Sequence, residues 1–247
     1  MQRIWNATLI MLVMSLSGLH VANADELPSI KQRVDQFNQE RAKDTKGPVL
    51  TADEKALMSK SAESVANNLP EPGLEVGSMA PDFSLGNAYG KKINLYSQLR
   101  KGPVVLMFYR GAWCPYCNIQ LHAMQESLPA FKKYNAQIIA VTPQQPDKSL
   151  EQVKKDKFPF EILSDVNDEV AKMYNLYFVV PAELHAFYKN KFKLDIEEYN
   201  GKGRTGLPVP GTFVISKSGE IIASFAEHDY MQRMEPAVIL DALKSAR

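Results

Sequence analysis

The sequence predicts an α/β fold in which helices cover both faces of a central sheet. Two continuous apolar runs, over 104–109 and 136–142, are typical of buried strands. Between them, apolar residues recur at helical spacing over 121–131. Two strand-like runs joined by a short turn, then a helical stretch, occupy 212–245. This alternation of strands and helices is typical of a sheet with helices packed on it.

The segment before this pattern is polar and predicts two helices, over 28–43 and 52–69. Thr51 and Glu54 have the spacing of a capping box, in which each residue caps the backbone of the other. These helices form an N-terminal extension to the main domain.

The stretch Leu69-Pro-Glu-Pro-Gly73 is rich in residues that break helices and strands. We therefore place a domain boundary there. It separates an N-terminal helical extension over 25–72 from a main domain over 73–247.

The main domain is interpreted as a series of short elements. We expect strands at 80–85, 93–95, 104–109, 136–142, 160–163, 212–216 and 220–225, and helices from 121 to 131, 147 to 157, 168 to 174 and 235 to 245. Pro129 is expected to kink the first of these helices. The segment 178–205 is rich in Lys, Tyr and Phe, breaks the alternation, and is interpreted as an insertion near the functional site.

The first 24 residues have the pattern of a secretory signal peptide. Arg3 is followed by a short apolar run over 7–19 and by the small residues Ala22-Asn-Ala24. The run is short for a membrane span, so we expect cleavage near Ala24 and no stable membrane anchor. The mature protein is then secreted or periplasmic.

The balance of charge excludes a strongly basic protein. The chain has 29 Lys and Arg against 28 Asp and Glu, and removal of residues 1–24 takes away only Arg3, so the mature chain is formally neutral. An electrostatic nucleic-acid surface is not indicated. No glycine-rich nucleotide motif follows a strand, so no cofactor is expected.

Cys114 and Cys117 are the only cysteines and follow the buried strand 104–109 directly. Their spacing closes too short a loop for a structural disulfide. At a helix start, unpaired N–H groups and the helix dipole favour a reactive thiolate, and two such thiols form a two-electron carrier. Zinc is the main alternative, but the mature chain offers only three histidines, at no metal-binding spacing, so no metal site is expected. An inert pair in a non-catalytic binding module is a further alternative.

The motif Phe108-Tyr-x5-Cys114-Pro-Tyr-Cys117, with Val209-Pro210-Gly-Thr-Phe-Val-Ile215, resembles the thioredoxin-like superfamily. The stretch 76–246, including Ala80-Pro-Asp-Phe-Ser-Leu85, is similar to its peroxiredoxin branch, the AhpC/TSA family, in the members that carry C-x-x-C. The resemblance implies a thioredoxin-like fold with a central mixed sheet flanked by helices.

The two halves of this resemblance assign the thiols differently. Thioredoxins imply that Cys114 is the exposed nucleophile, that Cys117 resolves, and that Val209–Pro210 is a cis bond facing the pair. Peroxiredoxins, with P-x-x-x-T-x-x-C, imply that Cys117 attacks peroxide and Cys114 resolves.

The chain departs from the peroxiredoxin signature at three positions. Cys114 replaces the threonine, Arg110 replaces the proline, and Pro210 stands where the family has an arginine. Arg110 or Arg204 is a candidate for a compensating charge. Trp113, Arg110 and Pro210 are the candidate substrate-binding residues.

The resemblance implies a thiol-dependent peroxidase that reduces hydrogen peroxide or organic hydroperoxides, with Cys117 and Cys114 as catalytic residues. It further implies an external dithiol reductant, a thioredoxin-like protein. The alternative is thiol–disulfide exchange on exported proteins, with Cys114 attacking. The sequence does not indicate an oligomeric state.

Overall fold

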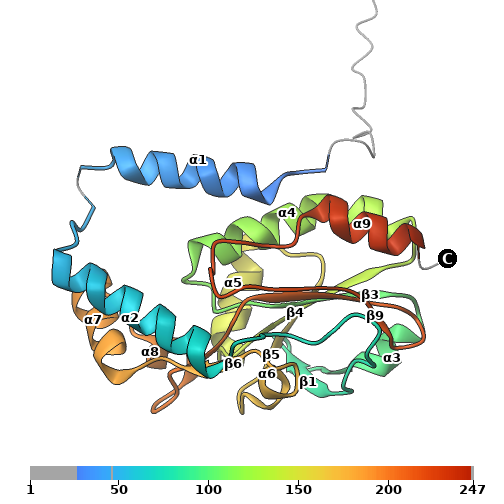
Figure 1. The fold of residues 1–247 in the computed structure, drawn as a ribbon. Helices are drawn as coiled ribbons and strands as arrows, with labels where there is room; N and C mark the ends of the chain where they lie inside the picture. Colours follow the sequence, from blue (N-terminus) through green and yellow to red (C-terminus); the bar gives the residue numbers. More distant parts are fainter. Residues whose placement is uncertain (1–26, 46, 246–247) are drawn as a thin grey trace, which may run out of the picture.

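The computed structural model describes residues 27–45 and 47–245, and a seven-stranded sheet forms its centre (Figure 1). In sheet order the strands are β2 (Lys92–Asn94), β1 (Ser84–Asn87), β5 (Glu161–Ser164), β4 (Gln137–Thr142), β3 (Val104–Phe108), β8 (Gly211–Ile215) and β9 (Ile221–Ala226). The central strands β3, β4 and β5 are parallel, and the other pairings are antiparallel. The predicted α/β fold with a mixed sheet is confirmed. The predicted signal peptide lies outside the described residues.

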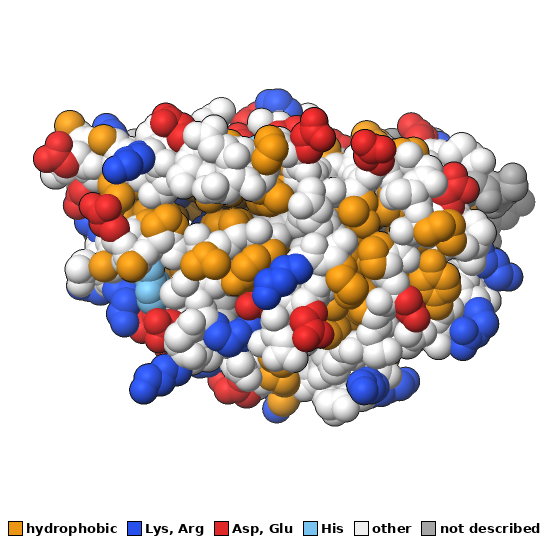
Figure 2. Space-filling view, turned by 60° about the horizontal axis from the view of Figure 1, so that its bottom comes forward, with side chains coloured by type: hydrophobic (Ala, Val, Ile, Leu, Met, Phe, Trp, Pro, Cys, Tyr) orange, Lys and Arg blue, Asp and Glu red, His pale blue; other side chains and the backbone are white. Residues whose placement is uncertain are grey.

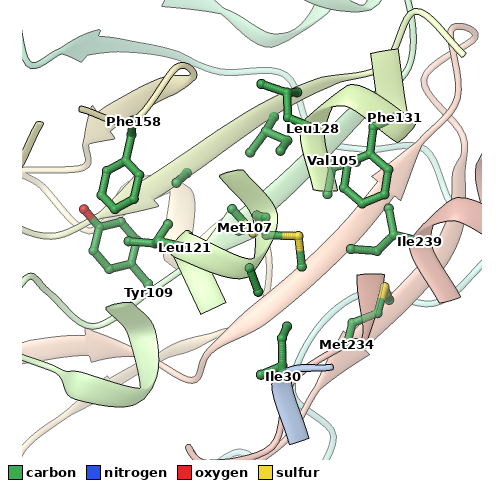
Figure 3. Close-up of a cluster of buried hydrophobic side chains, with 14 of the residues drawn as sticks. Ile30, Val105, Met107, Tyr109, Leu121, Leu128, Phe131, Phe158, Met234 and Ile239 are labelled. Atoms are coloured by element: carbon green, nitrogen blue, oxygen red, sulfur yellow. The ribbon is translucent and has the colours of Figure 1, made fainter. Parts of the chain in front are cut away.

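Helices cover both faces of this sheet, and each face has its own apolar core. On one face the core joins α1 (Ile30–Lys43), α4 (Pro115–Lys132), α5 (Pro146–Asp156) and α9 (Pro236–Ser245) to the sheet (Figure 3). On the other face it joins α3 (Leu95–Leu99) and α6 (Glu169–Met173). All five residues of β3 are buried, because this strand packs against both cores. The apolar run that predicted β3 reflects this double burial.

The N-terminal helix α1 is held on α4 and α9 by polar and aromatic contacts. Glu235 accepts hydrogen bonds from the backbone N–H groups of Ile30 and Lys31, at 2.9 and 2.7 Å, and so caps the start of α1. Arg33 forms a two-pronged ion pair with Glu126 of α4. Ile30 is only 1% exposed, so α1 contributes to the main core. The domain division at residue 72 stays a prediction.

The second N-terminal helix, α2 (Ala52–Asn68), begins with the predicted capping box between Thr51 and Glu54. It packs beside α7 (Ala182–Phe192), which belongs to the predicted insertion. The Glu54 carboxylate also pairs with Lys191 of that helix at 2.9 Å. The second helix of the extension, α2, and the insertion therefore lie together at one end of the sheet (Figure 1).

The insertion has more secondary structure than its sequence predicted. Besides α7 it contains α8 (Ile196–Asn200), and β6 (Tyr177–Val179) and β7 (Gly206–Pro208) pair as a two-stranded sheet at its two ends. The elements are short, and the two strands are paired across about 30 residues of chain, so no local periodicity indicated them.

One further expectation needed correction. The strand expected at 80–85 begins only at Ser84, because the Asp82 carboxylate instead accepts hydrogen bonds from the N–H groups of Phe83 and Tyr96 and from the Asn94 amide. Pro129 lies inside α4, and its expected kink stays a prediction.

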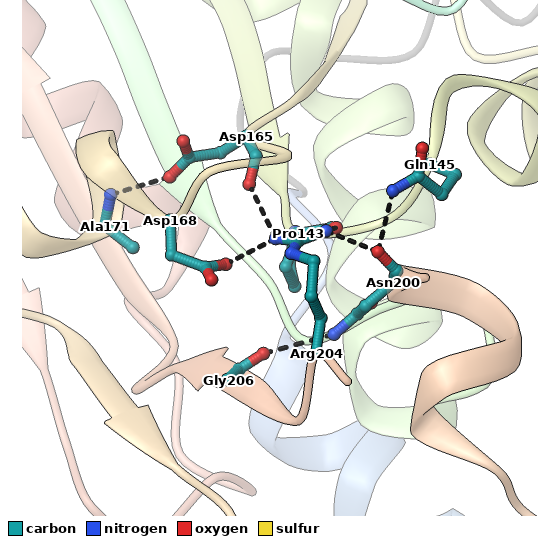
Figure 4. Close-up of polar contacts among 8 residues, drawn as sticks. All are labelled: Pro143, Gln145, Asp165, Asp168, Ala171, Asn200, Arg204 and Gly206. Carbon is teal, nitrogen blue, oxygen red and sulfur yellow. Dashed lines mark hydrogen bonds and ion pairs between the residues drawn. The ribbon is translucent and has the colours of Figure 1, made fainter. Parts of the chain in front are cut away.

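Arg204 connects the insertion to the segments that follow strands β4 and β5 (Figure 4). Its guanidinium donates to the Asp168 carboxylate at 2.7 Å and to the carbonyl oxygens of Pro143, Asn200 and Asp165. The Asp168 side chain is only 12% exposed, so this ion pair is largely shielded from water. Arg204 therefore serves the fold and is not the compensating charge considered for the thiols.

We expect Arg204→Leu to lower the free energy of unfolding by about 3 kcal/mol, because it leaves the buried Asp168 carboxylate and the carbonyls of Pro143 and Asp165 without their Arg204 donor. Urea denaturation of the purified variant measures this change. The matched control is Lys202→Leu, at an exposed neighbouring position, which should change stability by less than about 0.5 kcal/mol. Equal stability of the two variants would show that Arg204 does not anchor the insertion.

Charges of both signs are interspersed over the face of the molecule that Figure 2 shows. The surface there has no continuous basic stripe of the kind that binds nucleic acid. Among the helices of the described residues, none combines the length and hydrophobicity needed to cross a membrane.

Candidate active site

The two cysteines lie where β3 gives way to α4, as the sequence predicted. Cys114 is the N-cap residue of α4, Pro115 occupies the first turn, and Cys117 follows within that turn. The loop before the helix needs Gly111, whose φ is +154°, because a Cβ atom there would lie 2.4 Å from Nε1 of Trp113. The local sequence therefore places both thiols at the positive end of a helix.

The sulfur atoms of Cys114 and Cys117 are 2.7 Å apart and share a hydrogen bond. Both cysteines are free thiols. Their exposed fractions are 1% and 0%, so neither is the exposed nucleophile that the thioredoxin resemblance implied. At this separation a disulfide forms with only a small movement of the side chains.

Arg233 supplies a positive charge that the sequence analysis missed. Its Nη2 lies 3.6 Å from the Cys117 sulfur, and its side chain is largely buried. Its Nε donates to Oε1 of Gln120 at 2.8 Å, and the Gln120 amide donates to Thr212 at 3.1 Å. The guanidinium is thus held by α4 and β8 against the thiol. No motif could have revealed it, because Arg233 is 116 residues from Cys117 in an irregular segment before α9.

Arg110 lies on the other side of the pair. Its guanidinium carbon sits 4.9 Å from the ring centroid of Trp113 and 4.5 Å from that of Tyr230, between two aromatic faces. Its side chain is buried, and no carboxylate pairs with it among the described residues. The structure therefore brings together two of the predicted binding residues, Arg110 and Trp113, with the thiols.

The surroundings of the two thiols shift their pKa values in opposite directions. Burial disfavours the charged form of Cys117, but the hydrogen bond with Cys114 and the charges of Arg233 and Arg110 outweigh it and lower the pKa to about 6. Burial, the same hydrogen bond and the nearby Cys117 charge raise the pKa of Cys114 well above its usual range. The pair therefore carries one negative charge near neutral pH, and it resides mainly on Cys117.

Polar contacts fix the loop that carries Trp113. The Tyr109 hydroxyl donates to Gln152 at 2.8 Å, Gln152 donates to Asn118 at 3.0 Å, and Asn118 donates to the Ala112 carbonyl at 2.8 Å. The Ala112 N–H in turn donates to Gln144 at 2.7 Å. This network holds the start of α4 and keeps the thiols in place.

A cavity of about 620 Å³ opens above Cys114. Its walls come from α1, from the connection to α2, from α2 itself, from the insertion and from the segment after β9. The lining side chains are Phe37, Arg41, Pro48, Leu50, Met58, Arg110, Trp113, Cys114, Pro115, Tyr116, Tyr188, Phe192, Lys193, Leu194, Tyr199 and Tyr230. Cys117 is absent from this lining, so Cys114 is the thiol that faces the cavity.

The bond before Pro210 is not the one that the thioredoxin resemblance implied. The described residues contain no cis peptide bond, so the prediction of a cis Val209–Pro210 bond is wrong. Pro210 directly precedes β8, whose Gly211 pairs with Phe108 at the end of β3. It lines a smaller cavity that shares Arg110 and Tyr230 with the one above Cys114, and the Val209 N–H donates to the Leu176 carbonyl at 2.7 Å.

No metal cluster competes with this interpretation. Within residues 27–45 and 47–245, no group of three or more His, Cys, Asp or Glu side chains is placed to hold a metal ion. The two thiols and two arginines are therefore the chemically distinctive groups of the site.

Comparison with known proteins finds similarity to two groups of thiol proteins. The AhpC/TSA family model matches residues 76–224. Peroxiredoxin Q of Oryza sativa subsp. japonica is 36% identical over 108 residues, 44% of this chain and 48% of the relative. Thiol-disulfide oxidoreductase ResA of Geobacillus kaustophilus is 29% identical over 147 residues, 59% of this chain and 66% of the relative. The chain spans about half the length of the peroxiredoxin Q relatives that it matches.

Solved structures of similar fold are peroxiredoxins. Peroxidoxin BcpB from Mycobacterium tuberculosis superposes with a TM-score of 0.56 at 20% identity, covering 70% of this chain and 99% of that protein. Peroxiredoxin Q of Xanthomonas campestris gives 0.51 at 21% identity, covering 70% and 96%. These likenesses extend over the sheet and its flanking helices, and they support the fold.

Proposed function

Because the chain belongs to the AhpC/TSA family, we propose that it is a thiol-dependent peroxidase that reduces hydrogen peroxide or organic hydroperoxides. The observation that carries this proposal is the Cys117 thiolate. It lies in the first turn of α4, contacts Arg233 at 3.6 Å and has its resolving partner 2.7 Å away. A low pKa, a nearby cation and an adjacent second thiol are what the chemistry requires.

The proposed reaction proceeds in two steps. The Cys117 thiolate attacks one peroxide oxygen, the O–O bond breaks, and the leaving alkoxide or hydroxide takes a proton to become alcohol or water. Cys117 is then a sulfenic acid. The Cys114 sulfur attacks the Cys117 sulfur, water leaves, and a Cys114–Cys117 disulfide remains. Arg233 and Arg110 are placed to stabilise the negative charge on the departing oxygen.

Arg233 can replace the positive charge of the family arginine that this chain lacks. The position of the family arginine is occupied by Pro210, and the threonine is replaced by Cys114. We propose that Arg233, held by Gln120, supplies the cation from another segment. Trp113 and Arg110 then shape the approach to the thiols, and Pro210 lines a smaller cavity that Arg110 also borders.

We expect the isolated protein to lose two hydrogens on oxidation, through a Cys114–Cys117 disulfide, and to regain them with dithiothreitol. The separation of 2.7 Å makes this closure easy. Intact mass spectrometry after alkylation measures it. Stoichiometric zinc in place of the disulfide would contradict the redox proposal.

Thiol–disulfide exchange on other proteins is the second candidate. It is favoured by one observation, that Cys114 and not Cys117 lines the cavity, together with the similarity to ResA. Rates with hydrogen peroxide, an alkyl hydroperoxide and a protein disulfide, measured side by side, separate the two functions. Faster reaction with the protein disulfide would replace the peroxidase proposal.

The partner and the location follow from the same proposal. A peroxidase of this kind needs an external thiol to restore the dithiol, and a dithiol protein of the thioredoxin type is the partner proposed from the family. Export to the periplasm or outside the cell rests on residues 1–24 alone.

A further inference from the structure

Arg110 is a buried cation that pairs with no carboxylate among the described residues and lies close to the two thiols. Its guanidinium stacks between Trp113 and Tyr230, and its Nε is buried without a hydrogen-bond partner among the described residues. A buried arginine is normally paired with a carboxylate. Here the negative charge shared by Cys114 and Cys117 compensates the charge of Arg110 in place of a carboxylate.

That compensation exists only while the thiols are reduced. A disulfide carries no charge, so oxidation leaves Arg110 and Arg233 beside a neutral sulfur pair. The oxidised site therefore has an excess of buried positive charge next to the cavity. An anion that enters the cavity restores the balance, and it does so at the stage when the enzyme must meet its reductant.

The cavity has the character of a site for a small anion. Its volume of about 620 Å³ lies within the range of small-molecule sites, about 300–1,000 Å³. Two further cations, Arg41 of α1 and Lys193 at the end of α7, line its outer part, and both are exposed. The lining includes aromatic rings and no acidic residue.

Access to the sulfur favours a small molecule. Cys114 is 1% exposed, and the cavity above it is walled by α1 on one side and by α7 on the other. A thiol on a protein surface reaches this sulfur only if those helices move apart. A small thiol that enters the cavity needs a smaller movement of these helices to reach the Cys114 sulfur.

We propose that the cavity binds a low-molecular-weight thiol bearing carboxylates, and that this thiol reduces the Cys114–Cys117 disulfide by attacking Cys114. The inference rests on the proposed function, because it concerns the return of the oxidised enzyme to its dithiol. Arg41 and Lys193 bind the carboxylates at the mouth, and Arg110 binds one deeper in the cavity.

The reaction balances with two molecules of the thiol. The first thiolate attacks the Cys114 sulfur, a mixed disulfide forms, and Cys117 leaves as the thiolate stabilised by Arg233. The second thiolate attacks the small molecule's sulfur in the mixed disulfide and releases Cys114, which takes a proton. Two thiols are oxidised to one small disulfide, and the protein disulfide gains two electrons.

The first test measures binding without reaction. S-methylglutathione, which has carboxylates but no free thiol, is titrated by calorimetry into the full mature chain, reduced with dithiothreitol or oxidised with diamide. We expect it to bind the oxidised form about tenfold more tightly, because only that form lacks the compensating thiolate. Equal affinity for the two forms would overturn the proposal.

The second test measures reduction of the diamide-formed disulfide by glutathione, cysteamine and dithiothreitol, which are anionic, cationic and neutral. In Arg41→Gln/Lys193→Gln the rate with glutathione, divided by that with dithiothreitol, should fall about tenfold, and the ratio for cysteamine should rise. The control Lys101→Gln/Lys217→Gln removes two exposed charges distant from the cavity and should keep the wild-type ratios. Ratios that are equal in the two double variants, or reduction by a thioredoxin with negligible reaction of all three small thiols, would overturn the proposal.

Neither of these tests uses peroxide. A failure of the proposed thiol site is therefore distinguishable from a failure of the proposed peroxidase activity. Circular dichroism melting of each variant confirms that a change in rate does not come from unfolding.

Discussion

Cys117→Ser is expected to abolish peroxide consumption, by roughly a thousandfold or more, while Cys114→Ser still reacts once with peroxide. The reason is the difference in acidity within the pair. Cys117 has a pKa lowered to about 6 despite its burial, through the hydrogen bond with Cys114 and the charges of Arg233 and Arg110. The pKa of Cys114 is raised by burial and by its neighbour, so near neutral pH it stays protonated.

Dimedone labelling after a single pulse of peroxide measures the outcome. In Cys114→Ser the label should appear on Cys117, since no second thiol can condense with the sulfenic acid. The serine hydroxyl in that variant still donates a hydrogen bond toward the Cys117 sulfur, and Arg233 and Arg110 remain, so the pKa of Cys117 should stay low and the single reaction should proceed near neutral pH.

Labelling of Cys114 instead of Cys117 would show that Cys114 attacks peroxide first. Label on Cys114 alone in Cys117→Ser, with no reaction of Cys114→Ser, would assign the first attack to the thiol that faces the cavity. Mixed disulfides trapped through Cys114, with slow peroxide consumption in every form, would favour the exchange function.

Arg233→Leu is expected to slow the reaction with peroxide about tenfold near neutral pH and to shift the pH profile upward by about one to three units. In the wild type, the rate follows the thiolate fraction, rises as pH increases through about 6 and then levels off. Removal of the cation 3.6 Å from the Cys117 sulfur raises the pKa of that thiol, so the rise moves to higher pH.

Two controls separate this effect from a loss of structure. Arg233→Lys keeps the charge but loses part of the bonding to Gln120, and it should recover part of the rate and of the pH shift. Arg100→Leu removes an exposed arginine at the end of α3 and should leave the profile unchanged. A lower rate for Arg233→Leu with the same midpoint would mean that Arg233 stabilises the departing oxygen without setting the acidity of Cys117.

Local features of the fold were predictable because they depend on neighbouring residues. The burial of β3, the start of α4 at Pro115 and the capping box of α2 each follow from a short stretch of sequence. Short elements such as α3 and the small sheet of the insertion were missed, because packing and not periodicity holds them.

The bond before Pro210 shows that a sequence motif does not by itself determine the conformation of the backbone. The Val-Pro-Gly-Thr-Phe pattern resembles thioredoxins, yet Val209–Pro210 is not cis. The direction of this turn is set by the contact of Val209 with Leu176, 33 residues earlier in the chain.

The sequence by itself determined that two thiols stand at the start of a helix after a buried strand, an arrangement that favours redox chemistry. Only the tertiary structure decided which thiol is ionised and which one faces the cavity. The physical reason is distance along the chain. The pKa of Cys117 depends on Arg233, 116 residues away, and the cavity above Cys114 is built by α1, α7 and the segment after β9, which meet only when the sheet brings them to one end.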